Sequence, residues 1–415
     1  MEQSDLIYDW NLTEHHGQFL NNTVEICDET LRDGIQSPSI IDPKIEDKCE
    51  ILNLMNELGI TIADIGLPGA GMRAYNDVLA LATFARNKKL RIKLNCAART
   101  HIKDIEPIAR IQQIVGIPIT AYCFLGTSPI RQMVEDWDLD KLKFTTDEAV
   151  TFAQENGLSV AFVTEDTTRS GPETLKPLFE HALDLGVERL VLCDTVGHAT
   201  PIGIKALIDF ASTLIRQRKS PAVLDWHGHN DRGLAVSNAI FAAEYGCKRI
   251  HGTALGVGER VGNTAIDQLL INLKLLNAYQ QDLHALPAYL AKVSEACGIP
   301  IPYNYPVFGN DAFRTATGVH ASAVIKAMSK KNELLANLIY SGVPAHWFGK
   351  QQKIEIGPMS GASNVRHWLS THGISEKDEL ILALLGFAKE HDRVLRSDEI
   401  MRFINDFKKG TLPGS

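Results

Sequence analysis

Short apolar runs alternate with amphipathic segments along most of this chain. Between residues 45 and 58, isoleucine, leucine and methionine recur at helical spacing, and Gly59 follows as a stop. Residues 60–65 then form a run rich in β-branched side chains, which predicts a strand. Together with the strand-like run at 23–28, this pattern predicts one β-α-β unit.

The same unit repeats along the chain. The strand-like runs are 23–28, 60–65, 90–95, 117–125, 158–164, 189–193, 222–226 and 249–254. Helical segments separate them, which indicates parallel pairing, and eight such units predict a closed (β/α)8 TIM barrel. A doubly wound open sheet is the alternative. The loop at 29–34 lacks the glycine-rich dinucleotide fingerprint, which disfavours that alternative.

The strand-helix alternation ends near residue 275, and helical segments continue from there. A loop rich in proline, tyrosine and asparagine at 298–310 interrupts them without forming a long flexible linker. We therefore expect an N-terminal extension over 1–22, a barrel over 23–280 and a mainly helical C-terminal region over 281–415.

Composition narrows the class of protein. The chain has 415 residues, 45% of them hydrophobic, which is enough for a barrel and an appended region. Its net charge is −8 with no dense basic run, so we expect no nucleic-acid partner. Residues 1–22 are polar and no apolar run approaches about 18 residues, so we expect neither secretion nor a membrane span. None of the seven cysteines forms a Cys-x-x-Cys pair, which suits a reducing cytoplasm.

The segment 224–231 reads LDWHGHND and carries the strongest chemical signal. Side chains alternate along a strand, so His227 and His229 point the same way and can share one divalent ion. Imidazole is a common ligand for such ions. The alternative is a pair of strand histidines that are hydrogen-bonded inside the sheet.

Other polar residues follow the predicted strands, and in a barrel they converge on one mouth. They are Arg32, Asp33, Asn95, Thr127, Ser128, Glu165, Asp166, Asp194, Thr195, Glu259, Arg260 and Asn263. Asp33 is the best third ligand because it adds an anionic oxygen to two imidazoles, and Asn263 offers a carbonyl oxygen. Arg32 can stabilise an oxyanion, or form a salt bridge to Asp28 or Glu29. Iron oxygenases use the same three ligand types, so redox chemistry stays open here.

Three motifs resemble those of a known family. They are DETLRDGIQ at 28–36, HGHND at 227–231 and GVGERVGN at 256–263. In this order they are similar to the signatures of the metal-dependent (β/α)8 acyl-CoA condensing enzymes and lyases, which include 2-isopropylmalate, homocitrate and citramalate synthases. The resemblance extends from about residue 23 to about residue 360.

This resemblance implies a metal site and a reaction. Asp33, His227 and His229 would bind a divalent ion (Zn²⁺, Mn²⁺ or Mg²⁺), with Asn263 nearby. The ion would polarise the carbonyl of a 2-oxo acid, and acetyl-CoA would supply the attacking carbon. Arg32 would assist at the same oxygen.

The resemblance also implies roles for residues outside the metal site. Glu165 looks like the family's active-site glutamate, and Thr195 resembles its contact to the 2-oxo-acid carboxylate. His320 and Tyr340 look like residues that family members place over the partner subunit's barrel. The C-terminal region would therefore act as a lid and as the contact of a homodimer. The proton acceptor would be either Glu165 or the pair His320 and Tyr340.

The substrate is less well defined. Lyases of this family carry a cysteine in the glycine loop, and 256–263 has none. Homocitrate synthases hold a distal carboxylate with an arginine where this chain has Ala161. We therefore expect an apolar acid, 3-methyl-2-oxobutanoate, whose product is 2-isopropylmalate, a leucine precursor. Homocitrate, citramalate and related 2-alkylmalate synthases remain the alternatives.

Some positions depart from the 2-isopropylmalate synthase pattern. Tyr122 and Arg131 stand where many of these enzymes have histidines, and both are candidate substrate contacts. Arg131 could anchor a carboxylate of a different acid or be an ordinary surface cation. Ser322 replaces an aspartate, and residues 69–71 differ from the usual loop. We also expect insensitivity to leucine, because a leucine-binding C-terminal domain is lacking. A barrel kept only as a scaffold is the remaining alternative, although it would be expected to lose ligands, and Asp33, His227 and His229 are all present.

Overall fold

The computed structural model describes residues 7–8, 10–12, 24–330 and 332–411. The chain forms two compact units, Asp9–Pro300 and Ile301–Ser415, and the second also takes in Ile7 and Tyr8. Most of the expected extension over 1–22, and the first residue of the first expected strand, lie outside the described residues.

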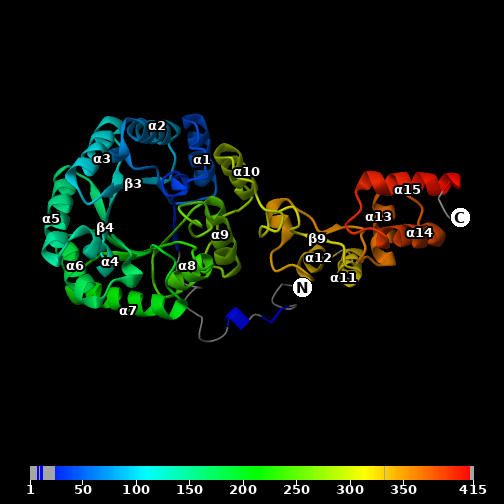
Figure 1. The fold of residues 1–415 in the computed structure, drawn as a ribbon. Coiled ribbons are helices and arrows are strands. Elements are labelled where there is room, and N and C mark those ends of the chain that lie inside the picture. Colours follow the sequence, from blue (N-terminus) through cyan, green and yellow to red (C-terminus); the bar gives the residue numbers. More distant parts are fainter. Residues whose placement is uncertain (1–6, 9, 13–23, 331, 412–415) are drawn as a thin grey trace. The chain divides into compact units, whose positions relative to one another are not determined.

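The first unit is a closed barrel of eight parallel strands, which confirms the predicted fold (Figure 1). The strands are β1 (Glu25–Asp28), β2 (Ile62–Asp64), β3 (Lys93–Arg99), β4 (Ile119–Gly126), β5 (Ser159–Glu165), β6 (Arg189–Asp194), β7 (Val223–Gly228) and β8 (Arg249–Gly252). Strand β1 closes the ring because Cys27 pairs with Ile62 of β2 and with His251 of β8. This closure excludes the open doubly wound sheet.

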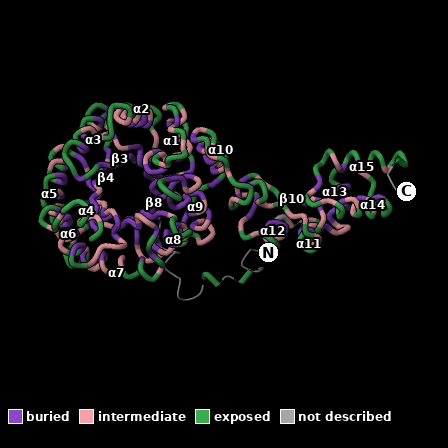
Figure 2. Tube along the Cα trace, in the orientation of Figure 1, coloured by how far each residue is buried: buried purple, intermediate pink, exposed green. Residues whose placement is uncertain are grey.

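Helices form the outer layer of the barrel. They are α1 (Ile45–Glu57), α2 (Met72–Lys88), α3 (Ile102–Val115), α4 (Pro129–Glu135), α5 (Leu139–Glu155), α6 (Pro172–Asp184), α7 (Pro201–Arg218), α8 (Ala235–Glu244), α9 (Ile266–Leu275) and α10 (Leu286–Cys297). Buried residues gather toward the inside of the ring, and exposed ones lie on its outer rim (Figure 2). No helix in the described part of the chain is long and apolar enough to span a membrane.

Strand β3 begins later than the expected run at 90–95. The backbone N–H of Leu90 bonds to the carbonyl of Ala85 and so closes the end of α2. The next two N–H groups, of Arg91 and Ile92, donate to the side-chain oxygen of Asn56. These three residues therefore satisfy their backbone donors outside the sheet, and regular pairing starts at Lys93.

The barrel unit continues past the boundary expected at residue 280 because α10 packs against α1. Tyr289 of α10 is fully buried, and its hydroxyl donates to Asp28 at 2.5 Å. It also lies 3.1 Å from the hydroxyl of Thr30. The helix is thus tied to the end of β1, directly before the segment that carries Arg32 and Asp33.

The second unit is mainly helical. Its elements are β9 (Arg314–Thr315), α11 (Gly318–Ser329), α12 (Glu333–Leu338), β10 (Lys353–Ile354), α13 (Ala362–Thr371), α14 (Asp378–Lys389) and α15 (Ser397–Lys409). Strands β9 and β10 pair in parallel. The last three helices enclose an apolar core of their own, which includes Val365, Leu369 and Leu384.

The contact between Asp28 and Tyr289 predicts a pH dependence of stability. Burial raises the pKa of Asp28 to about 6, although bonds from Thr30 and Tyr289 oppose this. Between about pH 4 and pH 6 the folded state keeps a proton that the unfolded state has lost, so raising the pH favours unfolding. We expect the free energy of unfolding of the wild type, relative to Asp28→Asn, to fall by about 3 kcal/mol over this interval.

Denaturant unfolding of both proteins between about pH 4 and pH 7 measures this difference. Above about pH 6 the difference should become constant. A difference that stays constant from about pH 4 upward would show that Asp28 does not titrate as a buried carboxyl.

Candidate functional site

A cavity of about 360 Å³ lies at the carboxyl ends of the barrel strands. Its lining includes the expected residues Arg32, Asp33, Tyr122, Glu165, Thr195, His227, His229, Glu259 and Arg260, together with Glu29, Gln36, Leu67, Ala97, Phe124, Val163, Val191, Cys193 and His251. The metal-ligand candidates and Arg32 follow β1 or come from β7 and the residues after it, and the apolar side chains come mainly from β3 to β6. The cavity is therefore a polar centre beside an apolar wall.

Asp33, His227 and His229 come together on the polar side of the cavity. The Nε2 atoms of the two histidines lie 3.1 Å apart. The Oδ2 atom of Asp33 lies 3.6 Å from the first and 3.4 Å from the second. Ligands about 2.0–2.2 Å from a zinc-sized ion are separated by about 3–3.6 Å, so this triangle has the dimensions of a metal site.

The protonation of these groups suits a cation. The Nδ1 atom of His227 lies 2.7 Å from Glu29 Oε2, a carboxylate oxygen that can accept its N–H, and in that tautomer the Nε2 atom carries the lone pair. Burial alone would raise the pKa of Asp33, but the Arg32 guanidinium and both imidazoles outweigh burial and hold this pKa well below its usual range. Asp33 is therefore an anion, and two imidazole nitrogens and one carboxylate oxygen form a donor set for Zn²⁺ or Mn²⁺.

Asn263 reaches the same centre through the glycine loop. It pairs with His229 in an isolated bridge, and its amide N–H donates to Asp33 Oδ2 at 2.5 Å. Among the described residues its Oδ1 atom has no hydrogen-bond partner, although it is buried. A Cβ at Gly258 would lie 1.9 Å from this atom, so the approach of the loop requires glycine there. The amide oxygen that could bind an ion thus has no other bond, while the NH₂ group of the same amide faces Asp33.

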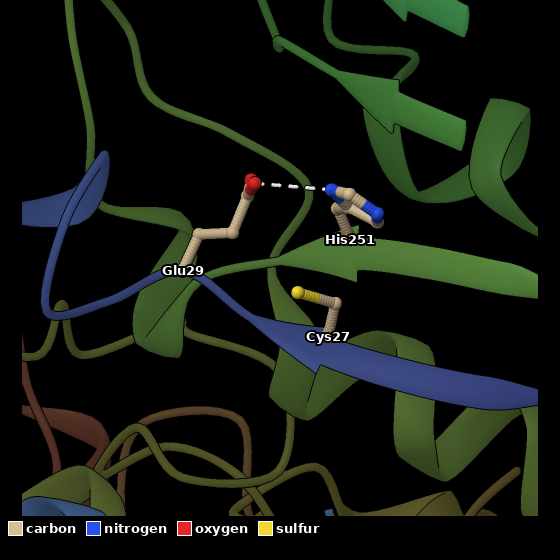
Figure 3. A group of neighbouring side chains, drawn as sticks. All are labelled: Cys27, Glu29 and His251. Carbon is tan, nitrogen blue, oxygen red and sulfur yellow. Dashed lines mark hydrogen bonds and ion pairs between the residues drawn. The ribbon is translucent and has the colours of Figure 1, made fainter. Parts of the chain in front are cut away.

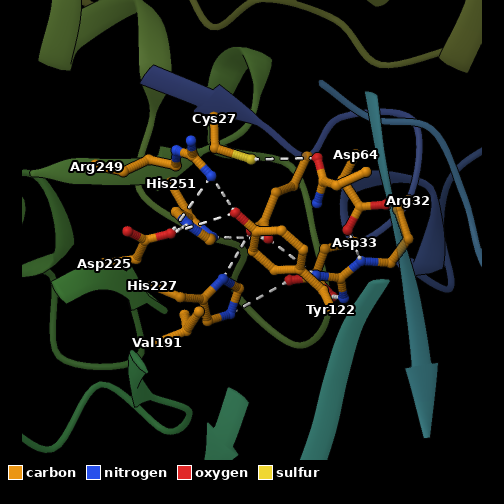
Figure 4. Close-up of polar contacts among 12 residues, drawn as sticks. Cys27, Arg32, Asp33, Asp64, Tyr122, Val191, Asp225, His227, Arg249 and His251 are labelled. Carbon is orange, nitrogen blue, oxygen red and sulfur yellow. Dashed lines mark hydrogen bonds and ion pairs between the residues drawn. The ribbon is translucent and has the colours of Figure 1, made fainter. Parts of the chain in front are cut away.

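Arg32 is held by three carboxylates (Figure 4). Its guanidinium donates to Asp64 at 3.0 Å, to Asp33 at 2.9 Å and to Glu29 at 3.0 Å. Asp28 and Glu29 were the alternative partners for a salt bridge of Arg32; Glu29 forms it, and Asp28 bonds to Tyr289 and Thr30. Three of the five N–H groups of the arginine are used in this way, which fixes its plane at the cavity wall.

Glu165 ends β5 and Thr195 directly follows β6, and both line the cavity. Burial, with the nearby carboxylates of Asp166 and Glu259, raises the pKa of Glu165 against the opposing charge of Arg131. The hydroxyl of Thr195 accepts the backbone N–H of Asp166 at 2.8 Å, so its own proton is free to donate.

Tyr122 of β4 and Arg131 of α4, which depart from the 2-isopropylmalate synthase pattern, lie in different places. Tyr122 is buried at the cavity floor, where its hydroxyl accepts from Arg249 and lies 3.3 Å from Asp225. Arg131 lies outside the cavity lining, 3.2 Å from Glu135 and 3.9 Å from Glu165. A direct contact between Arg131 and a substrate therefore stays a prediction.

His320 and Tyr340 belong to the second unit. Their rings stack with centroids 4.1 Å apart, and both side chains are exposed. His320 lies in the first turn of α11. The structure thus brings the two residues together, and their expected place over a partner's barrel stays a prediction.

Sequence reasoning missed several charged residues below the metal triangle. They are Glu25, Asp64, Arg189, Asp225, Arg249 and His251, and all contribute hydrogen bonds or ion pairs inside the barrel. Asp225 and His227 share one face of β7, and His229 follows the strand at the same two-residue period, so this period could have placed Asp225 there. Barrel interiors are usually filled by branched apolar residues, so charges at inward positions were an available signal.

Known proteins resemble the chain over most of its length. Residues 23–293 match the HMGL-like family model. The homocitrate synthase AksA of Methanocaldococcus jannaschii is 32% identical over 373 residues, covering 88% of this chain and 86% of that protein. A probable 2-isopropylmalate synthase of Ignicoccus hospitalis is 30% identical over 380 residues, covering 89% and 88%.

Solved structures share the fold. The hydroxymethylglutaryl-CoA lyase of Pseudomonas aeruginosa superposes with a TM-score of 0.54 at 18% identity, covering 67% of this chain and 94% of that one. The lyase of Brucella melitensis gives a TM-score of 0.55 at 16% identity, covering 66% and 98%. From the motifs, the barrel and these matches together, the chain belongs to the HMGL-like family, as an enzyme related to the 2-isopropylmalate and homocitrate synthases.

Proposed function

We propose that this chain catalyses a metal-dependent Claisen condensation of acetyl-CoA with a 2-oxo acid. Our preferred acid is 3-methyl-2-oxobutanoate, which gives 2-isopropylmalate and CoA and places the enzyme in leucine synthesis. The observation that carries the proposal is the triangle of Asp33, His227 and His229 inside a cavity with an apolar wall. The curated relatives named 2-isopropylmalate synthase support the same reaction.

Asp33, His227 and His229 would hold the divalent ion, with the amide oxygen of Asn263 beside it. Zn²⁺, Mn²⁺ and Mg²⁺ are the candidates, and two imidazole ligands favour the first two. Once bound, such an ion supplies Lewis-acid polarisation to a carbonyl. The arrangement explains why two histidine nitrogens face each other at 3.1 Å in a buried place.

Arg32 and Thr195 would orient the 2-oxo acid. Arg32 keeps a permanent positive charge at the cavity wall, and its two remaining N–H groups can stabilise the alkoxide that forms when the ketone is attacked. Thr195 can donate its hydroxyl proton to the substrate carboxylate, because its oxygen already accepts from Asp166. These contacts would place the ketone carbon toward Glu165.

The reaction needs a base that removes a proton from the methyl group of acetyl-CoA. The resulting carbanion forms the new bond to the ketone carbon, and water then cleaves the thioester and releases CoA. Glu165 is our first choice, since it lines the cavity and its raised pKa makes it a better proton acceptor. The stacked pair of His320 and Tyr340 is the alternative, supplied from the partner subunit of a homodimer.

The residues of the cavity wall favour a 2-oxo acid with an apolar side chain. Ala97, Val163 and Val191 line it, and Ala161 of β5 offers no cation to a distal carboxylate. The hydroxyl of Tyr122 is already engaged by Arg249 and Asp225. Homocitrate, citramalate and other 2-alkylmalate synthase activities are the alternatives that a substrate panel distinguishes.

The first prediction from this proposed function concerns turnover. With acetyl-CoA, purified enzyme should release free thiol only when both a 2-oxo acid and a divalent ion are present, and fastest with 3-methyl-2-oxobutanoate. A panel that includes pyruvate and 2-oxoglutarate, with and without chelator, measures this. A faster rate with another acid would replace the substrate and keep the reaction class. No thiol release with any acid would contradict the proposal, and oxygen consumption with ferrous iron would indicate an oxygenase.

The second prediction concerns the metal ligands. His229→Ala should weaken metal binding by more than about 100-fold, because it removes a direct ligand rather than an outer partner. Calorimetric titration with Zn²⁺ or Mn²⁺ measures this. The wild type should also gain about 2.7 kcal/mol of stability at a metal concentration about 100 times the dissociation constant, and the variant should not. Equal affinities would exclude His229 as a ligand.

The third prediction separates the two candidate bases. Glu165→Gln should lower kcat by about 10²–10⁴-fold and leave metal affinity unchanged, because the amide cannot accept the proton. His320→Gln is the matched variant in the second unit. A full rate in Glu165→Gln together with a large loss in His320→Gln would assign the base to the pair of His320 and Tyr340.

A further inference from the structure

A continuous chain of buried polar contacts runs from the metal triangle through the barrel interior (Figure 4). Glu29 Oε2 accepts from His227 Nδ1 at 2.7 Å, and its Oε1 atom lies 3.0 Å from His251 Nδ1. The other ring nitrogen of His251 lies 3.4 Å from Asp225 Oδ2. These contacts thus link β7 to Glu29, which directly follows β1, then to β8, and from there back to β7.

The far end of this chain is anchored by two arginines. Arg189 donates to Asp225 Oδ1 at 2.5 Å, and Arg249 lies 3.6 Å from Asp225 Oδ2. Both arginines also contact Glu25, at 2.6 and 2.9 Å. Strand register explains the cluster, because Arg249 is the direct neighbour of Asp225 on one side and of Glu25 on the other. Asp225 is therefore held in one orientation from below.

We propose that Glu29, His251 and Asp225 are positioning residues that fix the ring orientation and tautomer of His227. This inference rests on the proposed metal site. None of the three residues contributes an atom to the metal triangle. Glu29 contacts His227 and Arg32 directly, and His251 and Asp225 act on His227 through Glu29. Both nitrogens of His251 face carboxylate oxygens, so both carry protons, and Glu29 must accept from His251 and from His227 at once.

The geometry explains why a carboxylate is needed at position 29. Its two oxygens accept from His227, His251 and Arg32, which are all donors. A glutamine there has one oxygen, and its NH₂ group must face one of these donors. When the NH₂ faces His227, the Nδ1 atom becomes the acceptor and the proton moves to Nε2. In that tautomer the Nε2 atom, which faces the proposed ion, has no lone pair to donate.

Cys27, Glu29 and His251 lie close enough together to suggest a second metal site (Figure 3). The bonding argues against it, since His251 has no free lone pair between its two carboxylates. The thiol of Cys27 points to Asn95 Oδ1 at 3.8 Å, and burial raises its pKa well above the usual value. Cys27 lies on the same face of the chain as Glu29, two residues away, and supplies a matched control.

The experiment uses the full-length, metal-free protein. Calorimetric titration with Zn²⁺ measures the affinity and the stoichiometry, and a second titration with Co²⁺ records the visible absorption bands of the bound ion. Glu29→Gln should weaken affinity by about 10–100-fold, as loss of an outer-shell partner does. His251→Gln should weaken it less, in the same direction, because one donor to Glu29 is retained. Cys27→Ala should leave affinity, stoichiometry and the Co²⁺ spectrum unchanged. Melting temperatures of the metal-free variants show that each is folded.

The outcomes separate this inference from the proposed function. Loss of binding in His229→Ala with wild-type affinity in both Glu29→Gln and His251→Gln would overturn the positioning role and keep the metal site. Wild-type affinity in His229→Ala would overturn the metal site itself. Two ions per chain, with one lost in Cys27→Ala, would overturn the inference and assign a second site. If Glu29→Gln does not fold, His251→Gln decides the question alone.

Discussion

The closure of the barrel forces Asp33, His227 and His229 to one point inside a buried cavity, and this convergence governs the rest of the site. Three ligand atoms within 3.1–3.6 Å of one another repel unless protons or a cation lie between them. Arg32 keeps Asp33 ionised, and Glu29 accepts a hydrogen bond from Nδ1 of His227. The surrounding charges thus prepare the three groups for a cation.

The polar core below this point is costly for a barrel. Buried charges lose hydration, and an apolar filling of the same volume is often at least as stable. Here every charge has a partner, from Glu29 down to Asp225 and the two arginines at the barrel floor. Departures from a well-packed apolar core tend to occur at functional sites. The proposed role of these charges, which is to fix the ring orientation and tautomer of His227, explains why they are buried here.

Much of the fold could be predicted from the sequence. The alternation of apolar runs and helical segments determines a parallel barrel because each element must bury one face against the next. The first and last residues of single strands were harder to predict. Strand β3 starts later than expected because the backbone N–H groups of Arg91 and Ile92 donate to the side chain of Asn56 and not to a neighbouring strand. The packing of α10 on the barrel through Tyr289 also depends on a tertiary contact that no local pattern reveals.

The site could be predicted in part. Spacing placed His227 and His229 on one face, and the barrel mouth gathered Asp33, Glu165 and Thr195, whereas the partners of these groups depended on strand register. Cys27 lies beside His251 only because β1 and β8 meet when the ring closes, and Glu29 follows on the same face. Tyr122 lines the cavity, and its bonds with Arg249 and Asp225 also depended on strand register, so its contact with a substrate stays a prediction.

Anomalous diffraction from a crystal soaked in Zn²⁺ or Mn²⁺ tests the central claim most directly. The account predicts one strong peak per chain, about 2.0–2.2 Å from Asp33 Oδ2 and from the Nε2 atoms of His227 and His229. A peak located instead between Cys27 and His251, or no peak inside the barrel, would contradict it.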